Sequence, residues 1–151
     1  MSEQGVPVAP VPQGRYISAV VHGGVAYSAG MTPRVDGVLT VTGVVGHDLS
    51  IERAQEAAAL SARNAVTAIA AAVGGIDAIT RCLRMSVFVA CAPDFQELSA
   101  VADGASDALV ELLGIDSLPV RSAIGVSALP AGSPVEVELA AAVADQLTKP
   151  D

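Results

Sequence analysis

Apolar residues recur at helical spacing in two stretches of the chain, and each stretch predicts an α-helix. The first stripe consists of Ile51, Ala54, Ala58, Ala62, Ala65, Ile69 and Val73. Ser50 is a suitable N-cap for it and Gly74-Gly75 a suitable stop. The second stripe consists of Phe95, Leu98, Ala102, Ala105, Leu109 and Leu112. Gly104 weakens this helix in the middle and Gly114 ends it.

Six stretches with β-branched or alternating apolar residues predict strands. They are residues 16–21, 25–31, 38–42, 82–90, 121–128 and 135–143. Gly23-Gly24 between the first two predicts a hairpin, and Asp36-Gly37 is a turn signal before the third. The resulting order, β-β-β-α-β-α-β-β, predicts an α+β fold with both helices on one face of a mixed sheet.

Side-chain alternation then assigns residues to the two faces of each strand. In 121–128 we expect Ile124, Val126 and Ala128 to face the helices, and Arg121, Ala123, Gly125 and Ser127 to face away. In 82–90, Leu83, Met85, Val87 and Val89 share one side. In 135–143, Val135, Val137, Leu139 and Val143 match the helix face, and Glu136, Glu138, Ala140 and Ala142 match the Arg121 face. That otherwise small and apolar face is poorly suited to water, so we expect another copy of the chain to cover it.

Charge narrows the range of partners. The 151 residues carry a net charge of −8 and are 52% hydrophobic. No basic cluster is present, so neither nucleic acid nor an anionic membrane surface is an expected partner. No Gly-rich phosphate loop or metal-spaced cluster is present. Two cysteines, Cys82 and Cys91, are too few for a disulfide framework and indicate reduced thiols.

The length and composition of the chain predict one domain with two short extensions. Residues 1–13 carry several prolines and predict a flexible arm, residues 14–144 form the domain, and residues 145–151 form a tail. The first residues have neither a basic stretch nor an apolar core of the kind that secretory signals have. We therefore expect a cytoplasmic protein.

The segment Pro119–Ala141, PVRSAIGVSALPAGSPVEVELAA, resembles the C-terminal pattern of the RidA/YjgF family, formerly called endoribonuclease L-PSP. GRYISAV from Gly14 and YSAGMTP from Tyr27 agree with the same family, and the resemblance covers residues 14–144. It implies a chorismate-mutase-like fold, a homotrimeric barrel and ligand sites between subunits. It also implies hydrolysis of reactive 2-imino or enamine acids to 2-oxo acids and ammonia, with no cofactor.

The resemblance also implies roles for particular residues. Arg121 matches the arginine that pairs with the substrate carboxylate, Glu136 the glutamate that holds the water, and Tyr16 the aromatic residue of the first strand. Further predicted site positions are Ala29, Gly30, Ser99, Ala123 and Cys91. Cys91 is included because it lies just before a predicted helix start, where a thiol can be activated. Deaminase-type members carry Cys at the position of Ala123, Ser at that of Ala29 and Asn at that of Ser99. The chain therefore resembles a divergent subgroup, and its pocket would suit a larger or more apolar acid.

Several alternatives remain open from the sequence. The alternative for Arg121 is an ion pair with Glu136 or Glu138 across subunits. Glu136 could equally be only the counter-ion of Arg121. Asp103 and Asp107, four residues apart, indicate a solvated helix face. Loss of the polar positions favours a non-catalytic binding or regulatory module, whereas retention of Glu136 favours an enzyme. A third hypothesis is a ribonuclease, but the negative charge and the absence of a histidine pair disfavour it.

Overall fold

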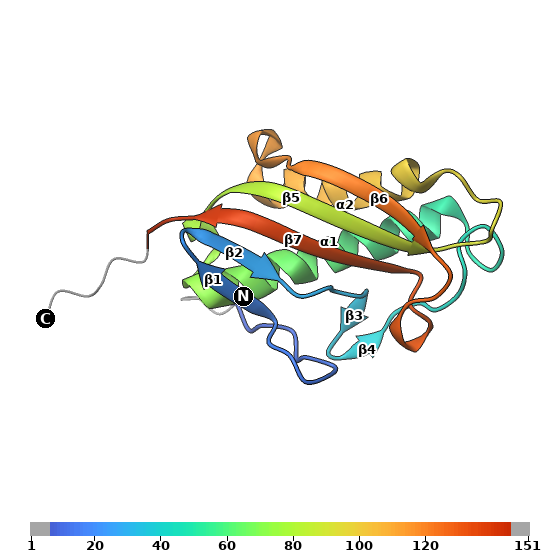
Figure 1. Ribbon diagram of the computed structural model, residues 1–151, viewed down its shortest axis with the longest axis horizontal. Helices are drawn as coiled ribbons and strands as arrows, with labels where there is room; N and C mark the ends of the chain where they lie inside the picture. Colours follow the sequence, from blue (N-terminus) through green and yellow to red (C-terminus); the bar gives the residue numbers. More distant parts are fainter. Residues whose placement is uncertain (1–6, 146–151) are drawn as a thin grey trace, which may run out of the picture.

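The computed structural model describes residues 7–145, and its centre is a five-stranded sheet with two α-helices behind one face (Figure 1). The strands are β1 (Ala19–His22), β2 (Val25–Ser28), β5 (Ile79–Ala90), β6 (Val120–Val126) and β7 (Val135–Val143). Their order is β1-β2-β7-β5-β6, with β5 and β6 parallel and the other neighbours antiparallel. The predicted mixed sheet with both helices on one face is confirmed. Residues 1–6 of the arm and 146–151 of the tail lie outside the described residues.

Helix α1 (Ile51–Val73) forms as its apolar stripe and caps predict. The Ser50 hydroxyl accepts a hydrogen bond from the Arg53 N–H at 3.2 Å, and Gly74 adopts the left-handed conformation with φ 91°. Six of the seven stripe residues are buried and Ile51 is half-buried. Because most of them are alanines, the helix axis can lie close to the sheet.

Helix α2 (Leu98–Leu113) is rotated relative to the predicted stripe. Its buried residues are Val101, Ala102, Gly104, Ala105, Ala108 and Leu109, whereas Leu112 is 38% exposed and Phe95 precedes the helix. Gly104 is the reason, because a Cβ there would lie 2.3 Å from the Gln55 carbonyl oxygen of α1. Gly104, which the sequence analysis took to weaken the helix, is therefore a position where the two helices approach each other closely.

The N-terminal hairpins are shorter than predicted. Gly23 and Gly24 both have positive φ and join β1 to β2, as expected. The predicted strand at 38–42 shrinks to β4 (Val38–Leu39), which pairs only with β3 (Arg34–Val35) in a separate ribbon. Asp36 and Gly37, with φ of 51° and 80°, form the turn between these two strands.

Strand β5 contains a bulge that corrects one predicted face. Cys82 pairs with Ala141, but Arg84 pairs with Ala140, so one extra residue is inserted at Leu83. An inserted residue reverses the alternation on either side of it. Cys82 and Met85 are consequently both buried, and Leu83 is 38% exposed instead of sharing the side of Met85.

The predicted faces of β6 are wrong. In the parallel register Met85 pairs with Arg121, Val87 with Ala123 and Val89 with Gly125. Those three β5 residues are buried beneath the helices, and paired residues of neighbouring strands point to the same side. Arg121, Ala123 and Gly125 therefore face α2, and Ile124, 40% exposed, faces away.

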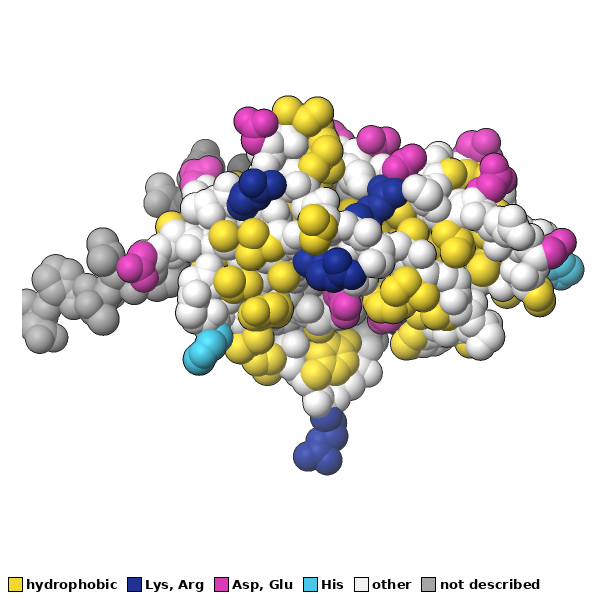
Figure 2. Space-filling view, turned by 45° about the horizontal axis from the view of Figure 1, so that its top comes forward, with side chains coloured by type: hydrophobic (Ala, Val, Ile, Leu, Met, Phe, Trp, Pro, Cys, Tyr) yellow, Lys and Arg dark blue, Asp and Glu magenta, His cyan; other side chains and the backbone are white. Residues whose placement is uncertain are grey.

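Residues 7–145 of this single chain leave the second face of the sheet uncovered, and we call it the open face. Glu136 and Glu138 of β7 lie on it, as predicted, because Val135, Val137 and Leu139 are buried on the other side. Its exposed apolar side chains are Val20, Tyr27, Val120 and Ile124. Figure 2 shows hydrophobic side chains gathered over this part of the molecule, with a few charged ones among them.

Candidate functional site

Arg121 lies in a polar notch between β6 and α2. Its Nη1 donates hydrogen bonds to Asp103 Oδ1 and Ser106 Oγ, both at 2.9 Å. Its Nη2 donates to Ser99 Oγ at 2.8 Å and, more weakly, to the Ser99 carbonyl at 3.4 Å. The Arg121 side chain is 21% exposed. A guanidinium held by four acceptors is fixed in orientation and available from one side.

The notch corrects one expectation from the sequence. Asp103 does not belong to a purely solvated face, because its carboxylate pairs with Arg121 across the helix–strand contact. Within residues 7–145, Arg121 pairs with Asp103 and not with Glu136 or Glu138. An ion pair between Arg121 and either glutamate across subunits stays a prediction. The missed residues were recoverable from one signal: Ser99, Asp103 and Ser106 recur at i, i+4 and i+7, so they form a polar stripe along one face of α2.

Glu136 lies on the open face against Gly30. A Cβ at Gly30 would lie 2.7 Å from Glu136 Cδ, so only glycine allows the carboxylate to sit there. Burial raises the pKa of Glu136, and the nearby Glu138 carboxylate raises it further. Within residues 7–145, no side chain or backbone group donates a hydrogen bond to the Glu136 carboxylate.

Arg121 and Glu136 therefore do not share a face, contrary to the sequence expectation. Arg121 points toward α2, whereas Glu136 points to the opposite side of the same sheet. The predicted site residues separate into two groups. Ser99 and Ala123 accompany Arg121, and Gly30 accompanies Glu136.

The remaining predicted site residues lie around these groups. The Tyr16 side chain is 48% exposed, and its hydroxyl accepts a hydrogen bond from the Gln13 N–H at 3.0 Å. Ala29 is half-buried against the core, with its N–H bonded to the Ser18 carbonyl at 2.8 Å. Cys91 is half-buried at the end of β5, beside Gly125 of β6.

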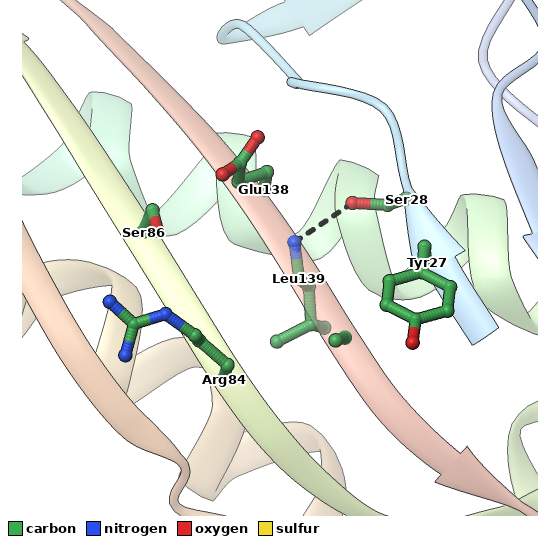
Figure 3. Close-up of a pocket in the computed structure, with 7 residues that line it drawn as sticks. Tyr27, Ser28, Arg84, Ser86, Glu138 and Leu139 are labelled. Atoms are coloured by element: carbon green, nitrogen blue, oxygen red, sulfur yellow. Dashed lines mark hydrogen bonds between the residues drawn. The ribbon is translucent and has the colours of Figure 1, made fainter. Parts of the chain in front are cut away.

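Two hollows adjoin these groups. One, of about 410 Å³, lies beside Cys91, and its lining is Cys91, Ala92, Pro93, Phe95, Leu98, Gly125, Val126 and Ser127. The other, of about 230 Å³, lies on the open face, and its lining includes Tyr27, Arg84, Ser86 and Glu138 (Figure 3). Arg84 Nη2 donates to Ser122 Oγ at 2.7 Å, so the guanidinium is turned away from Glu138, as Figure 3 shows.

Two classes of site are absent from the described part of the chain. Within residues 7–145, no group of three or more His, Cys, Asp or Glu side chains is arranged to hold a metal ion. Over the same residues, neither helix combines the length and apolarity needed to cross a bilayer.

Comparison with known proteins agrees with this architecture. The chain is 36% identical over 134 residues to Protein TCP17 of Trypanosoma cruzi, covering 88% of this chain and 84% of that protein. The crystal structure of Atu1372 from Agrobacterium tumefaciens superposes with a TM-score of 0.84 at 33% identity, over 89% of this chain and 85% of the other. The structure of E. coli TdcF with bound serine shares the fold, with a TM-score of 0.66 at 23% identity over 89% and 92% of the two chains.

A family model extends this similarity to nearly the whole domain. The model described as endoribonuclease L-PSP matches residues 6–143. This range contains both helices, every described strand and the Arg121 and Glu136 groups. The chain therefore belongs to the endoribonuclease L-PSP family, which is also known as RidA/YjgF.

Proposed function

We propose that the protein is a homotrimeric deaminase that hydrolyses small 2-imino acids in clefts between its subunits. The observation that carries the proposal is the division of the site: a fixed guanidinium on one face of the sheet, and on the other a carboxylate to which none of residues 7–145 donates a hydrogen bond. One chain cannot bring both groups to one small ligand. Two neighbouring chains can, if the Arg121 group of one meets the Glu136 group of the next.

The open face supports the assembly part of the proposal. Val20, Tyr27, Val120 and Ile124 are each at least 40% exposed on a single chain. Apolar side chains gathered on one sheet face indicate a surface that association removes from water. A cyclic trimer is the assembly that the family resemblance implies. In it each subunit would contribute Arg121 to one cleft and Glu136 to a different cleft.

The chemistry requires only water and the substrate. Arg121 would bind the substrate carboxylate, for which the ligand must share the guanidinium with Asp103. Glu136 would take a proton from water as the water oxygen forms a bond to C2 of the imine. That proton would pass to the imine nitrogen, which gives a carbinolamine. The hydroxyl proton of the carbinolamine would then move to the amine nitrogen as the C–N bond breaks and the C=O bond forms, so that 2-oxo acid and ammonia leave. A carboxylate whose pKa is raised is better matched to this proton transfer than an ordinary glutamate.

Bound serine in TdcF supports the ligand class, because serine carries the carboxylate and C2 nitrogen that an imino acid also carries. The test generates imino acids in situ with an L-amino-acid oxidase and catalase, and measures how much imine semicarbazide captures before hydrolysis. We expect the wild-type protein to lower that capture. Arg121→Ala should weaken binding of 2-oxo acids at least about tenfold, the loss of one charge-assisted hydrogen bond.

Glu136→Gln should retain binding and lose turnover, because an amide cannot accept the proton of water. Glu138→Gln is the matched control, since it neutralises a carboxylate on the same strand and the same face. It should retain turnover. Equal rates for wild type and Glu136→Gln, both above the spontaneous rate, would reduce Glu136 to a counter-ion. A solution mass near 15 kDa would remove the intersubunit site altogether.

A binding module is the second candidate, and one observation favours it. The chain's own acceptors occupy both terminal nitrogens of Arg121, and Ala29 and Ala123 add no polar side chains. Ligand binding that depends on Arg121, together with an unaccelerated rate for every imine, would support this candidate against the deaminase. Cleavage of RNA by the purified protein would favour the activity for which the family is named.

A further inference from the structure

We propose that the hollow beside Gly125 receives the apolar side chain of the substrate, so that the preferred substrates are 2-imino acids with large aliphatic or aromatic side chains. This inference rests on the proposed function, because it takes Arg121 as the carboxylate anchor. We call the cavity the Gly125 hollow, and its lining is Cys91, Ala92, Pro93, Phe95, Leu98, Gly125, Val126 and Ser127. Its volume is about 410 Å³.

The chemistry of the lining indicates an apolar occupant. Phe95, Leu98, Pro93 and Val126 present hydrocarbon surface, and Ser127 is the one lining residue with a hydroxyl. Specific ligand pockets combine mostly apolar walls with a few polar groups that fix orientation. Here the orienting polar group would be the Arg121 guanidinium, which binds Ser99 next to the lining residue Leu98. The hollow and the guanidinium together would match a molecule with one charged end and one apolar end.

Gly125 keeps the hollow open. A Cβ at this position would lie 3.1 Å from Cys91 Sγ and 3.4 Å from Leu98 Cδ1. The backbone of Gly125 does not need glycine, because it is absent from the residues with positive φ and lies in extended strand β6. Glycine in a strand interior weakens the strand and commonly marks a close approach of another group. Space, rather than backbone conformation, is therefore what glycine provides here.

The hollow and the notch lie along the same side of strand β6. Arg121, Ala123 and Gly125 are successive residues on the α2 side of β6, so Gly125 lies about 13 Å along the strand from Arg121. Arg121 leans toward the helix and binds Ser99, whose neighbour in sequence, Leu98, lines the hollow. Between them lies Ala123, whose side chain is a single methyl group.

The position of β6 provides access to this side of the strand. β6 is an edge strand of the sheet. The contact between β6 and α2 therefore lies at a sheet edge and not in the middle of the core. Gly125 is itself exposed, and Cys91 is half-buried. A ligand can therefore enter beside the strand with its carboxylate at Arg121 and its side chain directed toward Gly125.

The test compares substrates of increasing size in wild type and Gly125→Val. Imines are generated from alanine, leucine and phenylalanine, and the 2-oxo acids pyruvate, 4-methyl-2-oxopentanoate and phenylpyruvate are titrated by calorimetry. We expect wild type to prefer the leucine and phenylalanine imines at least about tenfold in kcat/KM, the discrimination that extra buried methylenes provide. Gly125→Val should remove that preference, because it should lower kcat/KM for the leucine and phenylalanine imines more than for the alanine imine.

Leu98→Ala supplies the opposite change, since it enlarges the hollow from the helix side and adds no group to clash. Leu98→Ala should shift the preference toward the largest imine. It therefore tests the hollow even if Gly125→Val lowers the yield of folded protein. Thermal melts and solution mass check that each variant keeps its fold and assembly.

The two proposals fail in different ways. If wild type accelerates no imine but binds phenylpyruvate more tightly than pyruvate, and Gly125→Val removes that difference, the hollow is supported and the deaminase is rejected. If wild type hydrolyses imines without preference for size, or if Gly125→Val lowers kcat/KM equally for all imines, the deaminase is supported and the hollow is rejected. Equal affinity for all three 2-oxo acids also overturns the hollow.

Discussion

Replacing Gly104 with alanine is a direct test of how closely α1 and α2 pack. In an exposed helix this change stabilises a protein, because alanine has a helix propensity about 1 kcal/mol better than glycine. Gly104 is buried, however, and a Cβ there would lie 2.3 Å from the Gln55 carbonyl oxygen and 2.8 Å from its carbonyl carbon. These neighbours are backbone atoms, which cannot rotate away as a side chain would.

The contact term is the larger of the two opposing terms. Overpacking in a protein core typically costs about 1–3 kcal/mol, and a clash with helix backbone lies at the upper end of that range. Subtracting about 1 kcal/mol for the better propensity leaves a net destabilisation of about 2 kcal/mol. For a chain of this length that corresponds to a fall in Tm of about 4–8 °C.

Differential scanning calorimetry of wild type, Gly104→Ala and Asp107→Ala measures this effect. Asp107 is exposed on the same helix, so its replacement improves helix propensity without adding a contact. We expect Asp107→Ala to change the free energy of unfolding by no more than about 0.5 kcal/mol. A Gly104→Ala protein that melts at or above the wild-type temperature would refute the close helix–helix contact.

Three further predictions follow from the titratable groups. Because burial raises the pKa of Glu136 and Glu138 raises it further, kcat/KM should fall as pH drops through a value above that of an ordinary glutamate, and Glu138→Gln should move this inflection to lower pH in a pH–rate profile. Burial raises the pKa of Cys82 to about 11, so a disulfide reagent at neutral pH should label Cys91 alone in the native protein and both thiols after denaturation; rapid labelling of two native thiols would contradict this. Asp103→Asn should cost less than about 1 kcal/mol of stability, because its carboxylate is 60% exposed, and should tighten 2-oxo acid binding severalfold in calorimetry by releasing the guanidinium; weaker binding would make the aspartate a positioning residue instead.

Features encoded by neighbouring residues were predictable from the sequence. Helix α1 begins after Ser50 and ends before Gly74 because a hydroxyl cap and a left-handed glycine act locally. The Gly23-Gly24 turn is local in the same sense. The element order and the family follow from such signals, and the comparisons bear out both.

Features that depend on a distant partner were not predictable in the same way. Leu83 leaves the predicted face because of a bulge against β7, more than fifty residues later in the chain. The α2 stripe is rotated because Gly104 meets Gln55 of α1, which no pattern within α2 reveals. In both cases tertiary contact overrides a regular local period.

The face of β6 is the error with the largest functional consequence. Alternation fixes which residues of a strand share a side, but not which side faces the core. β6 made this choice ambiguous, because one side carries Arg121, Ala123 and Gly125 and the other carries exposed Ile124. Only the register with buried Met85 and Val87 decides it, and that register is a long-range property.

This one choice ties the proposed chemistry to assembly. If Arg121 and Glu136 shared a face, a monomer could hold the substrate and its water together. Because they point to opposite sides of one sheet, the two groups can act on one ligand only when they come from different chains. Conditions that dissociate the protein without unfolding it should therefore abolish turnover, while the Arg121 notch, built from β6 and α2 of a single chain, should persist. Turnover by an isolated folded monomer would separate the two groups' roles and remove Glu136 from the reaction.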